Sequence, residues 1–248
     1  MIHFQNVTKS YGGRRVLSNI NLKIEEGEFM SLVGVSGAGK TTLIEALLGN
    51  MRLDDVDAVS AIFVNGVDIT RLSMVDLQRH RQTMGVVFQD YLLLPNKTVE
   101  ENVAFALEVC GGEEFEVRAR TAEALELVDM TRAKDQFPSQ LSGGEKQRTA
   151  LARALIHNPR IIIADEPTGN LDPHQSEEII RLLMRINDHG VTVILATHDK
   201  SLVNMVSKRV VTIHEGEIVS DWRQGKYDEE IIVLQSEDGI EIMEMELR

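Results

Sequence analysis

Short runs of hydrophobic residues alternate with segments of helical periodicity over the second half of the chain. The runs at residues 161–164, 191–196 and 210–214 are each long enough to form a strand, and a helical pattern begins at Pro173. Strands that alternate with helices pair in a largely parallel sheet, because each helix returns the chain to the same edge. The pattern therefore predicts an α/β domain.

The first forty residues follow a different pattern. Strand candidates occur at residues 2–11, 21–24 and 29–33, and turns that contain glycine separate them without an intervening helical segment. Consecutive strands joined by tight turns pair in an antiparallel manner. We therefore expect an antiparallel β-layer ahead of the first helix.

A helical period dominates residues 99–129. Apolar residues recur at helical spacing on both sides of the glycine pair 111–112, with Leu107 before the pair and Leu125 after it. This segment interrupts the alternation of strands and helices. We expect an inserted helical subdomain at about residues 90–158.

Length, charge and cysteine content limit the possible classes of protein. A chain of 248 residues with 43% hydrophobic residues forms one large domain, with or without a small lobe, and its formal net charge of −13 argues against a general nucleic-acid-binding surface. The single cysteine, Cys110, excludes an intrachain disulfide and fits a reducing compartment. The chain shows neither a signal peptide nor the roughly 18 apolar residues of a membrane span. We expect a cytoplasmic protein that reaches a membrane only through a partner.

The last part of the chain is strongly acidic. Residues 227–248 carry eight acidic residues and one basic residue. Two apolar segments, 230–235 and 240–245, flank a short polar turn, which is typical of a β-hairpin. An acidic disordered tail is the alternative. We treat residues 222–248 as an extension without an assigned role.

A phosphate-binding loop follows the third strand candidate. Residues 34–41 match the pattern G-x-x-x-x-G-K-[ST] between a strand and a helix, which is the context that this motif requires. Lys40 is expected to reach the β- and γ-phosphates, and the Thr41 hydroxyl to ligate Mg²⁺. A glycine turn before an ordinary helix is the structural alternative. The residues expected to bind the nucleotide here are Gly34, Ser36, Gly37, Ala38, Gly39, Lys40, Thr41 and Thr42.

Two carboxylates stand at the end of the apolar run 161–164, where α/β sheets bind their ligands. Asp165 is expected to hold Mg²⁺, directly or through water. Glu166 is expected to face the γ-phosphate and polarise the attacking water. Alone, such a pair could be a solvated turn, but the phosphate loop favours a catalytic role.

A capped helix begins near Ser142. Ser142 and Glu145, three residues on, form the sequence pattern of a capping box. Gly143 and Gly144 leave backbone N–H groups uncovered at the positive end of this helix, which indicates an anion site in addition to a cap.

Residues 141–147 resemble the signature motif of ATP-binding cassette ATPases, and the resemblance extends over residues 1–221. It implies a nucleotide-binding domain with a RecA-like parallel-sheet core, an antiparallel layer and an inserted helical subdomain. It also implies MgATP as the bound nucleotide and a homodimer. In this dimer Ser142, Gly143 and Gly144 of one copy would cap the γ-phosphate held by the other.

The resemblance gives roles to four more residues. Tyr11 would stack on adenine, although it could also be a partly buried aromatic of the β-layer. Gln89 would sense Mg²⁺ and the membrane partner, whereas by itself it is an ordinary polar residue at a strand end. His198 would contact the γ-phosphate, and Asp172 would lie in the loop through which the two subunits sense each other.

Two segments narrow the choice within the family. Residues 165–172 resemble the branch that acts in cell division, lipoprotein release and macrolide efflux, and residues 88–107 are most similar to its cell-division members. An FtsX-like integral membrane protein is then the implied partner, and regulation of cell-wall hydrolysis at division is the implied function. An exporter motor is the alternative. The apolar residues 91–94 would either dock the partner or pack on the helical lobe.

Other classes fit less well. DNA-repair members of the family insert long coiled-coil arms before the signature, and the interval from Lys40 to Leu141 leaves no room for them. A molecular switch that binds ATP and hydrolyses it very slowly is a further alternative function. Two departures from the family pattern are Val35, where proline is common, and the segment 54–61, which is about four residues longer than usual.

Overall fold

The computed structural model describes residues 1–54, 60–223, 233–236 and 239–242. Six strands form the main sheet in the order β10-β9-β3-β8-β7-β6. Five of them run parallel, and β10 is antiparallel to β9. Their bounds are β3 Phe29–Val33, β6 Met84–Phe88, β7 Ile161–Asp165, β8 Thr192–Thr197, β9 Arg209–His214 and β10 Glu217–Trp222. The predicted α/β class with a largely parallel sheet is confirmed.

A second, antiparallel sheet has the order β2-β1-β4-β5. It consists of β1 Ile2–Tyr11, β2 Arg14–Ile24, β4 Ala61–Val64 and β5 Val67–Asp68. The prediction that residues 29–33 belong to this layer is wrong, because β3 lies between β8 and β9 in the main sheet. All five residues of β3 are buried, as expected for a strand covered on both faces.

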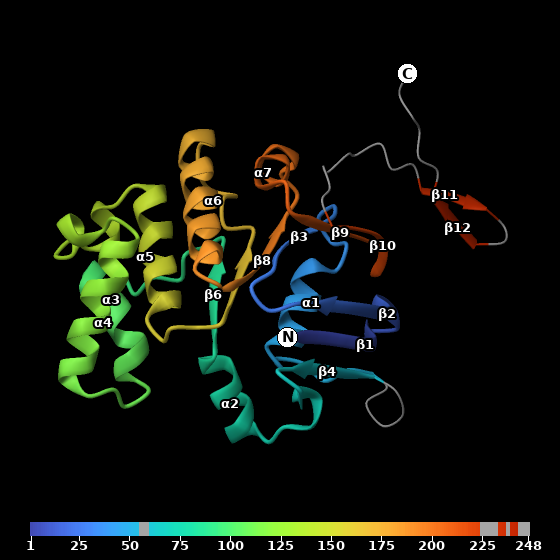
Figure 1. Cartoon of the computed structure of the whole chain (residues 1–248), viewed down its shortest axis with the longest axis horizontal. Coiled ribbons are helices and arrows are strands. Elements are labelled where there is room, and N and C mark those ends of the chain that lie inside the picture. The colour runs from blue at the N-terminus through green and yellow to red at the C-terminus, as the bar shows by residue number, and fades with distance from the viewer. Residues whose placement is uncertain (55–59, 224–232, 237–238, 243–248) are drawn as a thin grey trace.

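Different helices pack against the two faces of the main sheet. Successive side chains of β7 point to opposite faces. Ile161 and Ile163 pack in the cluster that contains α1 (Lys40–Leu47) and the antiparallel sheet. Ile162 and Ala164 pack with α5 (Gly143–Leu155) and α6 (Pro173–Asp188). Helices α1 and α5 therefore cover opposite faces of one sheet, and Figure 1 shows them on different sides of the molecule.

Helices α3, α4 and α5 gather at one end of the molecule, away from the antiparallel sheet (Figure 1). Helix α3 spans Val99–Glu108 and α4 spans Glu114–Leu127, so the predicted break at the glycine pair is confirmed. The remaining helices are α2 Met74–Gln82, α7 Lys200–Val206 and the 3-10 turns Ile69–Arg71, Thr131–Ala133 and Pro138–Gln140.

Near the C-terminus, β11 (Val233–Ser236) pairs with β12 (Gly239–Ile242) in an antiparallel manner, as in a hairpin. The rest of residues 224–248, and residues 55–59 of the long segment before β4, lie outside the described residues. Within the described ranges, every helix is too short or too polar to cross a membrane.

Candidate functional site

The phosphate loop connects β3 to α1 and has a backbone that requires glycine. Gly34 has φ +157, and a Cβ there would lie 2.3 Å from the carbonyl oxygen of Ile213. Gly39, at the N-cap of α1, has φ +113, and no side chain of the described residues caps the helix. The first N–H groups of α1 therefore stay available for an anion. A cavity of about 600 Å³ opens beside this loop and is lined in part by Val16 and Ser36.

Lys40 joins the phosphate loop to the end of β7. Its side chain is 6% exposed, and its Nζ donates a hydrogen bond to the Gly34 carbonyl oxygen at 2.7 Å. The same Nζ lies 3.3 Å from Oε1 of Glu166. The predicted phosphate-binding cation is thus paired with the predicted general base.

Glu166 adopts a left-handed backbone with φ 48, which is uncommon for a residue other than glycine. Its N–H donates to the Ala196 carbonyl oxygen at 2.9 Å, which ties the residue to β8. Nδ1 of His198 lies 2.9 Å from Glu166 Oε1 and donates to it. Strained backbones cluster at functional sites, where the surrounding structure holds them in place.

Asp165 is the buried carboxylate of the site. Among the described residues its Oδ1 atom has no hydrogen-bond partner. Burial raises the pKa of Asp165 above its ordinary value, hydrogen bonding from the Thr41 hydroxyl opposes this shift, and the nearby Glu166 raises the pKa further. A free carboxylate oxygen beside a hydroxyl fits a hard cation such as Mg²⁺, which takes oxygen ligands and usually binds through one or two protein groups. The structure therefore brings Thr41 and Asp165 together in a suitable donor set.

Gln89 lies with the loop that precedes α6. Its Nε2 is 3.4 Å from Oδ1 of Asn170, and Nδ2 of Asn170 donates to the Gln89 carbonyl oxygen at 3.1 Å. A Cβ at Gly169 would lie 2.7 Å from the Gln89 amide nitrogen. These contacts hold Gln89 against the loop that ends at Asp172, and the predicted Mg²⁺ contact of Gln89 stays a prediction.

The predicted capping box at the start of α5 is confirmed. The Glu145 N–H donates to Ser142 Oγ at 3.3 Å, and the Ser142 N–H donates to Glu145 Oε2 at 2.8 Å. Hydrogen bonds from Ser142 lower the pKa of Glu145. A Cβ at Gly143 would lie 3.0 Å from Leu171, so the turn packs against the same loop that holds Gln89. We name residues 142–144 the signature turn.

Two further predicted residues lie at the ends of elements. Tyr11 ends β1 and is 50% exposed, with the Lys9 ammonium 5.1 Å from its ring centre. This leaves ring surface accessible for stacking. Asp172 is the N-cap of α6, and its carboxylate accepts a hydrogen bond from the Gln175 N–H at 2.9 Å. Its capping role was not predicted, although an Asp-Pro pair at a helix start is a signal for it.

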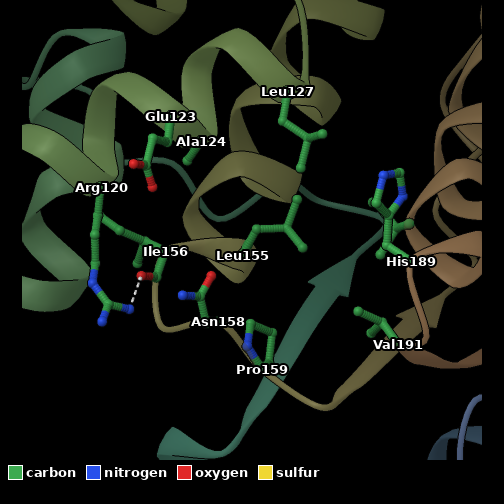
Figure 2. Close-up of a pocket in the computed structure, with 11 residues that line it drawn as sticks. Arg120, Glu123, Ala124, Leu127, Leu155, Ile156, Asn158, Pro159, His189 and Val191 are labelled. Atoms are coloured by element: carbon green, nitrogen blue, oxygen red, sulfur yellow. Dashed lines mark hydrogen bonds between the residues drawn. The ribbon is translucent and has the colours of Figure 1, made fainter.

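A separate cavity of about 400 Å³ is lined by residues that precede β7 and β8, so it lies near the amino ends of these strands. Figure 2 shows Leu127 of α4, Leu155 of α5 and Val191 around this space. Pro159, which precedes β7, also lines it, whereas Asp165 ends β7. This cavity is therefore distinct from the candidate site.

Comparisons with known proteins agree with this geometry. Residues 17–169 match the family model described as "ABC transporter". The chain is 43% identical to the cell division ATP-binding protein FtsE of Streptococcus pneumoniae and 44% identical to that of Bacillus subtilis. Both alignments span 228 residues and cover 92% of this chain, with 97% and 98% of those proteins.

Among solved structures, the chain resembles the dimeric ATP-binding cassette MJ0796 in a post-hydrolysis state bound to ADP and Pi, with 34% identity and a TM-score of 0.80. That match covers 92% of this chain and all of MJ0796. The relatives cover 92% of the chain. The family match includes the phosphate loop, Gln89, the signature turn, Asp165 and Glu166, whereas Tyr11, Asp172 and His198 lie outside residues 17–169. The chain belongs to the ATP-binding cassette family and is an ATPase.

Proposed function

We propose that this chain is the MgATP-hydrolysing subunit of an FtsEX-type membrane complex that regulates cell-wall hydrolysis during cell division. The observation that carries the proposal is similarity to FtsE over 92% of the chain, together with a site in which Glu166 contacts both Lys40 and His198. We assign the ATPase domain to residues 1–221, with the helical subdomain at about residues 90–158.

The contacts suggest how the site works. Lys40 would exchange its bonds to Gly34 and Glu166 for the β- and γ-phosphates of ATP. Glu166, released from Lys40, would orient a water and accept its proton. The water oxygen attacks the γ-phosphorus, and the bond to the bridging oxygen of ADP breaks. Mg²⁺, held by Thr41 and Asp165, would neutralise charge on the phosphates. Tyr11 would stack on the adenine.

The placement of the two motifs supports a homodimer. Helices α1 and α5 cover opposite faces of the main sheet, so the signature turn is not on the face that carries its own phosphate loop. We propose that the signature turn of a second copy completes the site, and that Asp172 and Gln89 lie near the dimer interface. MJ0796, which resembles this chain, is dimeric.

Ser142→Arg tests this cross-subunit role. We expect the variant to bind ATP normally and to lose ATP-dependent dimerisation, because a large side chain enters the turn that faces the second nucleotide. Ser73→Arg is a matched control, since Ser73 is also a serine N-cap, at the start of α2. If Ser142→Arg dimerises as well as Ser73→Arg, the cross-subunit role is wrong.

We infer that the partner is an FtsX-like integral membrane protein, which would place this chain on the cytoplasmic face of the cell membrane. Leu92, beside Gln89, is 57% exposed and offers an apolar docking surface. The test is a pull-down from membranes with Glu166→Gln and MgATP, with Lys40→Ala as the control. Recovery of an FtsX-like protein supports the proposal, whereas recovery of a permease with a large periplasmic domain would indicate an exporter motor instead.

A further inference from the structure

Two consecutive residues after Gln89 adopt a backbone that costs energy. Tyr91 has φ 58 and Leu92 has φ 50, so both lie in the left-handed region that favours glycine. Single residues with a side chain visit this region, but two in succession need support from the surrounding structure. The segment 91–92 is therefore held in place by something outside itself.

The support comes from Arg153 in the last turn of α5. Its Nη1 donates to the Leu92 carbonyl oxygen at 2.6 Å, and its Nη2 donates to the Tyr91 carbonyl oxygen at 2.9 Å. Burial lowers the pKa of Arg153, and within the described part of the chain no carboxylate forms an ion pair with it. The guanidinium group of Arg153 therefore donates hydrogen bonds to two main-chain carbonyls instead of pairing with an acidic side chain.

The same segment also touches the other end of α5. The Tyr91 hydroxyl oxygen lies 3.2 Å from the position that a Cβ would take on Gly143, the first residue of the helix. Gly143 and Arg153 are ten residues apart, or about 15 Å along the helix axis. Tyr91 therefore spans part of α5, with its backbone bound near the end and its hydroxyl against the signature turn.

We propose that Arg153 is a positioning residue for ATP-driven closure. By holding the carbonyls of Tyr91 and Leu92, it keeps the Tyr91 hydroxyl against Gly143 and sets the position of the signature turn. The segment after Gln89 and the turn that caps the second nucleotide then move as one body. This inference rests on the proposed cross-subunit role of the signature turn.

The test uses the purified full chain without a membrane partner. Arg153→Lys keeps the charge but loses the two-pronged contact. In the Glu166→Gln background we expect Arg153→Lys to raise the ATP concentration needed for dimerisation about tenfold, as for a typical coupling between sites. In the wild-type background kcat should fall by a similar factor. ADP affinity, which uses the phosphate loop and Tyr11 but not the signature turn, should stay unchanged.

A double-mutant cycle separates positioning from a general loss of stability. Tyr91→Ala should reproduce the effect of Arg153→Lys, and the double variant should be no worse than either single one, because both act through one contact. Arg209→Lys is the matched control: Arg209 is also held in place by its contacts, here with Glu28 and Asp221. It should lower the melting temperature without changing dimerisation.

Two outcomes would overturn the inference. Dimerisation by Arg153→Lys at wild-type ATP concentrations would contradict it, as would additive effects of Arg153→Lys and Tyr91→Ala. Ser142→Arg in the same assay keeps this failure distinct from that of the proposed function. If Ser142→Arg blocks dimerisation and Arg153→Lys does not, only the role of Arg153 is wrong.

Discussion

Lys40 Nζ and Glu166 Oε1 lie 3.3 Å apart, where the phosphate loop meets the end of β7. The Lys40 side chain is 6% exposed and that of Glu166 is 18% exposed, so solvent screens the pair only in part. Because one ammonium cannot serve both the carboxylate and the phosphates fully, substrate binding and release of the general base are linked. The predictions below for Lys40 and for Glu166 depend on this contact.

Lys40→Ala removes the ammonium group that is expected to bind the β- and γ-phosphates of ATP. Loss of one partner from a buried, hydrogen-bonded charge pair costs about 2–5 kcal/mol, so we expect ATP to bind at least about 30-fold more weakly. Isothermal titration calorimetry measures this directly. Lys23→Ala is the control, since Lys23 is exposed and pairs with Glu25, which is also exposed. Retained affinity in Lys40→Ala would show that residues 34–41 are not the phosphate site.

Asp165→Asn should make the folded protein more stable while it abolishes ATP hydrolysis. Burial raises the pKa of Asp165, so its ionised form destabilises the folded protein above that pKa. Without metal or nucleotide at neutral pH, we expect the asparagine variant to be more stable by about 1 kcal/mol. Its Mg²⁺-dependent hydrolysis should be lost. Denaturation with urea tests the first expectation, and a variant less stable than the wild type would contradict it.

The stability that the capping box of α5 contributes to the folded protein should depend on pH. Hydrogen bonds from Ser142 lower the pKa of Glu145 below its ordinary value of 4.5. The ionised carboxylate therefore contributes stability above pH 4.5, and this contribution is lost as the pH falls through the lowered pKa. Ser142→Ala should lose about 1 kcal/mol near neutral pH and progressively less in acid. A stability difference that stays constant with pH would argue against the Glu145 contribution.

The sequence predicted most of the elements, and its main error concerned the position of one strand. Residues 29–33 were expected in the antiparallel layer because no helix precedes them. Four of these five residues are apolar and Ser31 alone is polar, which was the opposite signal, since a strand buried on both faces shows no regular alternation. The first part of β2 was not predicted, because the charged residues Arg14 and Arg15 do not show the hydrophobic pattern of a strand. The pairing of this part of β2 with β1 is also irregular.

The motif residues were predictable because each motif is local in sequence. The contacts between motifs were not. Arg153 binds the carbonyl oxygens of Tyr91 and Leu92, which lie 62 and 61 residues before it in the chain. Gln89 and Asn170, which are hydrogen-bonded, are 81 residues apart. Local spacing gives no information about such pairs, which depend on how α5 packs against the end of β6. An arginine on a helix otherwise rich in alanine and leucine is the weak signal that could have pointed to Arg153.

The most direct test of the account is the behaviour of Glu166→Gln with MgATP. If Glu166 activates the water in a site shared by two copies, the variant should bind ATP normally, lose at least about 100-fold in turnover and accumulate as a dimer. Glu126→Gln, an exposed substitution on α4, should resemble the wild type. Light scattering combined with phosphate release measures both properties. A Glu166→Gln protein that hydrolyses ATP at the wild-type rate, or stays monomeric with ATP bound, would contradict the account.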